Sequence, residues 1–97
     1  MIIITGSILA SEDSLEELRR LSVEHVVRSR QEPGCLSHGV HQDVENPLRL
    51  VFFERWANMD AVRAHFAVPE SGAFVKRAGE LAESTSDLEL YQASPIG

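Results

Sequence analysis

Four stretches of the chain carry the alternating apolar and polar residues, or the β-branched composition, that are typical of strands. They span residues 2–10, 35–43, 48–56 and 85–92. The third stretch, LRLVFFERW, has the clearest alternation. An Asn-Pro turn at residues 44–47 separates it from the second, so these two stretches are predicted to form a hairpin.

The segments between the predicted strands have apolar residues at the spacing of an α-helix. Apolar residues recur every three or four positions over residues 13–30, and a Pro-Gly step follows them. A second helix is predicted from residue 58 or 60 to 68, where Pro69 interrupts it, with a further helical piece over residues 70–82. The resulting order is strand, helix, strand, strand, helix, strand.

This order is the βαββαβ arrangement of a ferredoxin-like α+β fold with an antiparallel sheet. With 97 residues and 10.8 kDa, the chain has the length of one domain, so we expect a single domain over residues 1–97. The core of so short a chain is modest.

Both faces of the predicted sheet are apolar. In the first strand Ile4 and Ile8 lie on one face, and Ile3 and Leu9 lie on the other. One layer of helices covers only one face, so we expect a second copy of the chain to cover the other. Any pocket is expected to depend on this homodimer for its shielding from water.

Charge and composition narrow the possible partners. A net charge of −6 repels phosphate backbones and anionic lipid surfaces, so neither nucleic acid nor a membrane is expected as a partner. The apolar start lacks a basic region and is too short for a bilayer, which favours a cytoplasmic protein. The single cysteine, Cys35, forms no intrachain disulfide and is interpreted as a small buried hydrophobe.

Candidate chemistry begins with the four histidines, because no phosphate loop, zinc-protease motif or nucleophile elbow is present. His38 and His41 face opposite ways in a regular strand and cannot share a metal ion, so no metal site is expected. His65 is the strongest candidate base, since it lies beside the predicted buried stripe of Met59, Val62 and Phe66. His25, at the edge of the first helix stripe, is the weakest. Each histidine could equally be structural.

Glu54 and Trp56 are the next candidates. Glu54 shares a strand face with Leu50 and Phe52, where a carboxylate must find a partner or take up a proton. It is therefore either a structural anchor or a tuned acid or base. Trp56 is either core or a surface on which a flat aromatic molecule can stack. Ser37 could line the sheet but has no adjacent base that would make it a nucleophile.

Several segments together resemble the antibiotic biosynthesis monooxygenase family, and in particular its small quinol monooxygenases. They are EPGCLSHGVHQD, VFFERW and AVRAHFAVPESGAF. In that family a helix ends in PGC, the third strand ends in E-x-W, and the next helix carries A-H-F or A-H-L. Here the E-x-W motif is residues 54–56 and the A-H pair is residues 64–65.

The resemblance implies a ferredoxin-like subunit that pairs into a dimeric α/β-barrel. It also implies oxygenation of a phenol, quinol or polyketide-type aromatic by O₂, without a cofactor or metal. His65 and Glu54 match the catalytic positions, and His38 lies where the quinol enzymes have a tyrosine. The predicted substrate contacts, in a cavity between the second helix and the sheet, are Trp56, Phe52, His38 and Ser37.

Two alternatives stay open. One is a non-catalytic dimeric module that binds a small hydrophobic metabolite. The other is a haem-binding or haem-degrading relative. The family's haem-degrading members use an Asn, a Trp and a His, and the corresponding positions here are Gly6, His65 and Ala78. A haem site would therefore need other ligands, such as His38 or His41.

Overall fold

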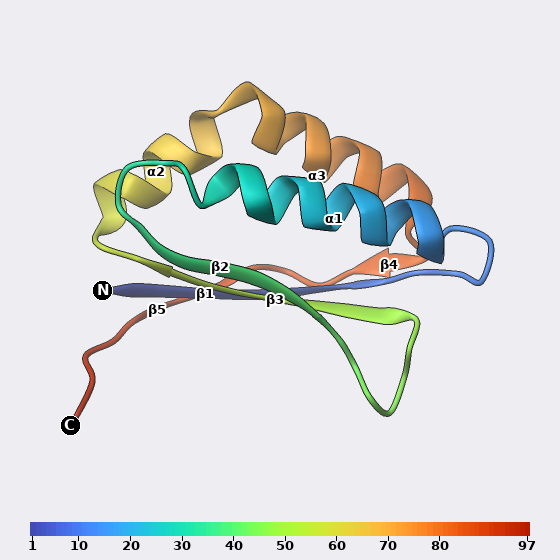
Figure 1. Ribbon diagram of the computed structural model, residues 1–97, viewed down its shortest axis with the longest axis horizontal. Helices are drawn as coiled ribbons and strands as arrows, with labels where there is room; N and C mark the ends of the chain where they lie inside the picture. Colours follow the sequence, from blue (N-terminus) through green and yellow to red (C-terminus); the bar gives the residue numbers. More distant parts are fainter.

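A computed structural model describes all 97 residues. Its helices and strands follow one another in the order predicted from the sequence. Three helices lie over one face of a five-stranded antiparallel sheet (Figure 1). The elements are β1 (Ile2–Leu9), α1 (Leu15–Ser29), β2 (Cys35–Gln42), β3 (Arg49–Trp56), α2 (Met59–Ala67), α3 (Pro69–Leu81), β4 (Ser84–Thr85) and β5 (Glu89–Gln92).

The strand order confirms the ferredoxin-like prediction. The sheet runs β2-β3-β1-β4, and β5 pairs with the same edge of β1 as β4 does. The register sets Glu54 opposite Ile4 on one side and His38 on the other. Strands β1 and β3 therefore form the centre of the sheet, and Glu54 is on a central strand.

The last predicted strand is divided into β4 and β5. Between them the chain passes over Gly6 of β1, where Ser86 exchanges hydrogen bonds with Ser7. The Cδ2 atom of Leu88 lies only 2.7 Å from the position that a Cβ on Gly6 would take. A side chain on Gly6 would therefore require the Leu88 side chain to move.

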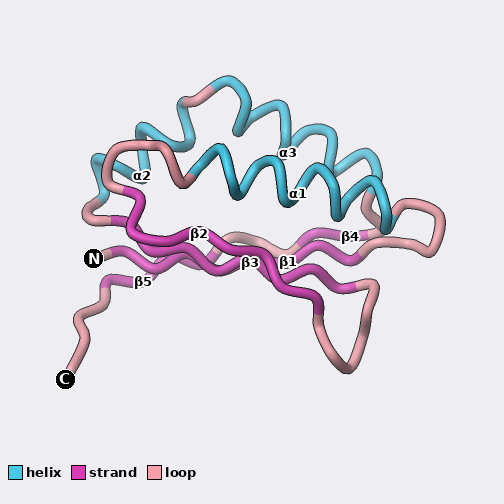
Figure 2. The backbone as a smooth tube through the Cα atoms, viewed as in Figure 1, coloured by secondary structure: helices cyan, strands magenta, loops and turns pink.

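The helices form one layer over the sheet (Figure 2), and the buried side chains of the core lie between the two layers. Alternate residues of β1 and β3 face the helices, and one buried group surrounds Leu18 and Phe52 while another surrounds Ile4 and Trp56. On the opposite face no helix lies over the strands, and Phe53 is 42% exposed. None of the three helices has the length and apolar character needed to span a membrane.

Helix α2 corrects one prediction about its buried face. Asn58 caps the helix by accepting a hydrogen bond from the Ala61 N–H, at 2.9 Å. Val62 and His65 are the buried residues, whereas Phe66 is 47% exposed. The prediction that Phe66 belongs to the buried stripe was wrong, because the face turned toward the sheet is centred on His65.

Candidate functional site

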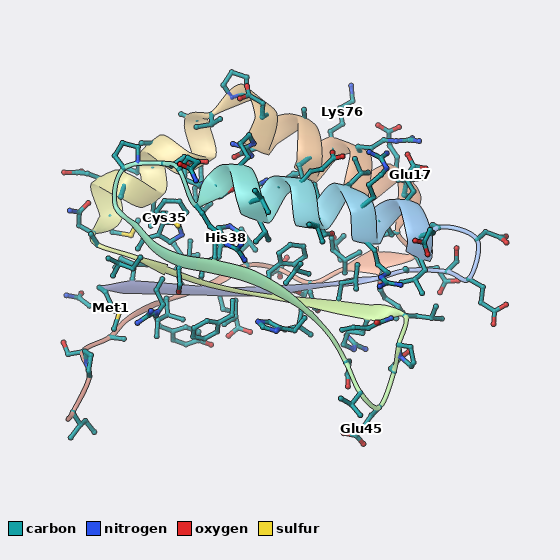
Figure 3. The ribbon with its side chains drawn as sticks, in the orientation of Figure 1. Met1, Glu17, Cys35, His38, Glu45 and Lys76 are labelled. Atoms are coloured by element: carbon teal, nitrogen blue, oxygen red, sulfur yellow. The ribbon has the colours of Figure 1, made fainter.

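Four elements bring titratable side chains to one buried cluster between the sheet and the helices. His25 comes from α1, His38 from β2, Glu54 from β3 and His65 from α2, and each is at most 8% exposed. Figure 3 shows His38 between β2 and the helix layer. Titratable groups gathered in a core need partners, and the cluster supplies most of them from within.

Glu54 is held by its neighbour on the same strand face. The indole Nε1–H of Trp56 donates a hydrogen bond to Glu54 Oε1 at 2.9 Å. His38 Nε2 lies 3.2 Å and His65 Nε2 3.8 Å from the same oxygen. Burial alone would raise the pKa of Glu54, but the contacts with His38 and Trp56 and the electrostatic effect of the nearby His65 ring outweigh it and lower that pKa. Glu54 is therefore a buried carboxylate at neutral pH.

His65 has one ring nitrogen occupied and one free. Its Nδ1 lies 2.9 Å from Glu32 Oε1. A carboxylate only accepts hydrogen bonds, so Nδ1 carries the proton and the Nε2 of the neutral ring keeps its lone pair. That nitrogen points into the cluster, with the Trp56 ring 4.6 Å away between centroids. A histidine oriented in this way by a carboxylate is suited to accept a proton or to bind a cation.

Arg28 organises the side of the cluster nearest α1. Its guanidinium donates to Glu32 Oε2 at 3.1 Å, to Ser71 Oγ at 3.2 Å and to His25 Nδ1 at 2.9 Å. Because arginine only donates, the neutral His25 ring accepts through Nδ1. Burial, with the neighbouring His38, His65 and Arg28, lowers the pKa of His25 to about 3. His25 is consequently neutral at neutral pH.

His38 is the least satisfied member of the cluster. Its side chain is fully buried, and neither ring nitrogen has an aligned hydrogen-bond partner. An irregularity in β2 between Cys35 and Ser37 fixes its direction, because it sets His38 in register with Glu54. Ser37 and His41 alternate with His38 and thus face the other side of the sheet, where Ser37 Oγ accepts a hydrogen bond from Arg55 Nε at 2.8 Å.

The structure thus groups most of the predicted site residues and separates one. The residues that lie together are His38, Glu54, Trp56 and His65. Phe52 is two residues before Glu54 on β3 and faces the same side of the sheet. Ser37 lies on the opposite face of the sheet and is not part of this cluster. Cys35 is half-buried and packs beside Trp56, close to its predicted role as a small hydrophobe.

The structure places in the cluster His25, which was the weakest candidate from sequence, and Glu32, which the sequence analysis did not single out. His25 lies beside Val26, with Ser22 and Ser29 three and four residues away on the same helix face, and all three are buried. These small hydroxyl residues on a core stripe were a usable signal, because they leave room for a larger polar neighbour. Glu32 lies in the turn after α1, so helix periodicity gave no indication of its direction.

Aromatic rings pack against the cluster on the side of α3. Phe74 of α3 stacks on His25 with ring centroids 4.2 Å apart and 8° between the planes. Its edge also meets Phe52 at 5.9 Å. An open depression of about 380 Å³ lies beside the cluster and is lined by Glu32 and Ala64, among others. Glu32 therefore links the buried His65 to the molecular surface.

The cluster also has the composition of a cation site. One nitrogen from each of His25, His38 and His65 can be chosen so that all three lie within 4.8 Å of one another. The argument from sequence against a metal site considered only His38 with His41, which do lie on opposite faces. It did not anticipate that three separate elements would bring three histidines together.

Together, the ferredoxin-like fold and its buried carboxylate–histidine cluster define a small α+β protein with a group of titratable side chains between the sheet and the helices. The sequence pattern of the antibiotic biosynthesis monooxygenase family matches residues 1–77. The chain belongs to that family, as the motifs at residues 54–56 and 64–65 indicated.

Similar proteins agree with this assignment. A candidate antibiotic biosynthesis monooxygenase from Deinococcus radiodurans has a TM-score of 0.93 and 29% identity, covering 99% of this chain and 95% of its own. Rv0793 from Mycobacterium tuberculosis has a TM-score of 0.88 at 21% identity, over 97% of this chain and 95% of its own, and supports the fold alone. The Deinococcus protein thus carries in its name the same family that the sequence pattern matches.

A curated relative has no function in its name. The uncharacterized protein sll1783 of Synechocystis sp. is 32% identical over 91 residues, which cover 94% of this chain. The match spans 62% of the length of that relative. The substrate and the partners of this chain are therefore matters for proposal.

Proposed function

We propose that this protein is a cofactor-independent monooxygenase that oxygenates a small electron-rich phenol or quinol with O₂. The observation that carries the proposal is the free Nε2 of buried His65, oriented by Glu32 through Nδ1 at 2.9 Å. A base so placed can take a phenolic proton inside an apolar site. The resulting phenolate is electron-rich enough to pass an electron to O₂ without a flavin or a metal ion.

The surrounding residues have separable roles in this proposal. His65 accepts the hydroxyl proton, and the ionised Glu54 stabilises the imidazolium that forms 3.8 Å away. Trp56 and Phe52 form the apolar wall against the substrate ring, and His38 is the second polar contact. The buried surroundings exclude water, which would otherwise quench a reactive oxygen intermediate.

The overall reaction balances for a simple hydroquinone. One atom of O₂ enters the ring and the other leaves as water, so C₆H₆O₂ and O₂ give C₆H₄O₃ and H₂O. The substrate supplies all four electrons that O₂ takes up, and no external reductant is needed. His65 returns its proton to the departing oxygen.

Substrate entry requires Phe74 to move. Its ring stacks on His25 in parallel, as a flat aromatic substrate would. In the proposed cycle a substrate ring displaces Phe74 and takes up the same stacking position. Pairing of two chains through the uncovered sheet face would bury the opposite side of the sheet, so the predicted homodimer would act on the occupied site only indirectly, through the strands.

Oxygen consumption with a panel of hydroquinones and phenols tests the proposal directly. The wild-type protein is expected to exceed the spontaneous rate, and His65→Ala to lose at least about 100-fold of that excess, the usual contribution of a positioned base. His41→Ala is the matched control, because His41 lies on the opposite face of the sheet. Folded wild-type protein without uptake above background on any substrate contradicts the proposal.

The same samples separate the two alternative functions. Tight binding of an aromatic ligand without turnover identifies a binding module. A shifted haem absorption band on titration identifies a haem protein. Neither outcome is expected for a cofactor-independent oxygenase.

A further inference from the structure

We propose that His25, His38 and His65 form a binding site for one divalent transition-metal ion, with Glu54 as a fourth ligand. The three rings come from α1, β2 and α2, and their centroids are 5.3–5.5 Å apart in every pair. One nitrogen from each can be chosen within 4.8 Å of the others. The ion would occupy the Nε2 of His65, the base of the proposed oxygenation, so the two roles belong to different states of the protein, one with metal and one without it.

The incompletely partnered ring of His38 points to a ligand. Its side chain is fully buried, Nδ1 has no partner, and Nε2 has only a poorly aligned contact with Glu54 Oε1 at 3.2 Å. Leaving such a group unpaired in a core is unfavourable, and a metal ion would satisfy one nitrogen. Glu54 Oε1 is already 3.2 Å from His38 Nε2 and 3.8 Å from His65 Nε2. Ligand atoms in a tetrahedral zinc site are about 3.4 Å apart, so the three rings, whose chosen nitrogens are now up to 4.8 Å apart, would have to move closer together around the ion.

The neighbours of the cluster resemble the outer shell of a metal site. Glu32 accepts the Nδ1–H of His65 and leaves Nε2 as a donor to the ion, which is the usual carboxylate–histidine–metal arrangement. Two carboxylates, Glu32 and Glu54, and one guanidinium, Arg28, surround the rings, so the added positive charge is favoured. To bind through Nε2, His25 must move its proton to Nδ1. Arg28 then loses its 2.9 Å hydrogen bond to that nitrogen and must turn away from it, while keeping its bonds to Glu32 and Ser71.

The ligand set selects the kind of ion. Imidazole nitrogens with one carboxylate suit Zn²⁺, Co²⁺, Ni²⁺ and Fe²⁺, whereas Mg²⁺ and Ca²⁺ prefer oxygen ligands throughout. Zn²⁺ and Co²⁺ are therefore the appropriate probes. The only tryptophan, Trp56, has its ring 4.6 Å from that of His65, so paramagnetic Co²⁺ should quench its fluorescence.

Titration of EDTA-treated, dialysed protein with Co²⁺ and Zn²⁺ tests the site without any activity measurement. We expect one ion per chain, quenching of Trp56 by Co²⁺, visible absorption typical of four-coordinate Co²⁺, and displacement by Zn²⁺. His25→Gln should weaken binding at least about tenfold, and His41→Gln should leave it unchanged. Mg²⁺ in excess should not compete.

Histidine ring NMR signals of the wild-type protein give a second measurement that does not depend on a variant folding. Zn²⁺ should shift the signals of His25, His38 and His65 and leave those of His41 in place. Absence of stoichiometric binding, or binding that shifts only His41, overturns the proposed site. Oxygen uptake by the EDTA-treated protein tests the proposed function separately, because that reaction uses no metal.

Discussion

At the scale of single residues, the site depends on a carboxylate that stays ionised inside a core. Burial raises the pKa of Glu54, and the contacts with His38, Trp56 and His65 more than reverse that effect. The E-x-W spacing provides one of these contacts locally, because residues two apart on a strand share a face and Trp56 therefore lies beside Glu54. Trp56 thereby satisfies its own indole N–H and fixes the carboxylate with one bond.

Removing Glu54 should therefore destabilise the fold. Glu54→Ala leaves the Trp56 Nε1–H without its acceptor and opens space in the core, so we expect the free energy of unfolding to fall by about 2–4 kcal/mol. Glu54→Gln keeps an acceptor and should lose about 1 kcal/mol. Urea denaturation followed by circular dichroism measures both. Glu45→Ala, at the exposed tip of the β2–β3 hairpin (Figure 3), is the control and should change stability by less than about 0.5 kcal/mol.

The depressed pKa of His25 predicts a loss of stability in acid. The folded chain protonates this ring only near pH 3, whereas the unfolded chain does so near 6.5. As the pH falls from 6.5 toward 3, the unfolded state takes up a proton that the folded state excludes. The free energy of unfolding should then decrease by at most about 1.4 kcal/mol per pH unit from this group.

The contribution of His25 can be isolated by substitution. The groups around it are His38, His65, Arg28 and Glu54, and these remain in His25→Gln. The lowered pKa of Glu54 also makes the free energy of unfolding decrease as the pH falls, but only at lower pH, near and below the ordinary carboxyl range. Denaturation between pH 6.5 and 4.5 should thus show a shallower slope for His25→Gln. An unchanged slope would assign the acid sensitivity to other groups.

At the scale of elements, the turn between α1 and β2 determines how closely α2 approaches. Gly34 has a φ of 83°, in the left-handed region that glycine adopts without strain. A Cβ there would lie 2.6 Å from Ala61 Cβ of α2. The Gly34 carbonyl also accepts a hydrogen bond from the Ala57 N–H at 2.8 Å, just before α2. This glycine therefore helps to position the helix that carries His65.

Two glycine substitutions should have opposite effects. Gly34→Ala combines an unfavourable φ with a clash against α2, and we expect it to lower the free energy of unfolding by about 1–3 kcal/mol. Gly72→Ala in α3 meets open space and should raise that energy by about 0.5–1 kcal/mol. Thermal denaturation compares the two. Equal effects of both variants would contradict the role given to the turn.

Much of the element order was predictable because periodicity and turn residues are local signals. The alternation of LRLVFFERW, Pro69 and the capping Asn58 located β3, α3 and α2 to within a few residues. The irregularity near Leu36 and the interruption at Gly6 depend on contacts distant in sequence, and pattern alone did not reveal them. The meeting of His25 with His38 and His65 has the same origin, since it requires three elements to converge.

At the scale of the whole molecule, the two faces of the sheet differ in their covering. The helices lie on one side only, and the tail after β5 leads away from the sheet (Figure 1). On the uncovered side Phe53 is 42% exposed, and an open depression of about 440 Å³ brings it together with His41 and Leu36. Exposed apolar surface of this kind on a small chain is typical of an interface.

A single charge on this face should separate the proposed homodimer. We expect the wild-type chain to be a dimer in light scattering after size exclusion at micromolar concentration. Phe53→Arg should give a folded monomer, because burying an unpaired guanidinium at the interface is unfavourable. Phe66→Arg is the control, since Phe66 is 47% exposed on the helix side and should leave the dimer intact. If site closure depends on pairing, the Phe53→Arg monomer should also lose oxygen uptake, whereas a wild-type monomer with full activity would show that one chain closes the site by itself.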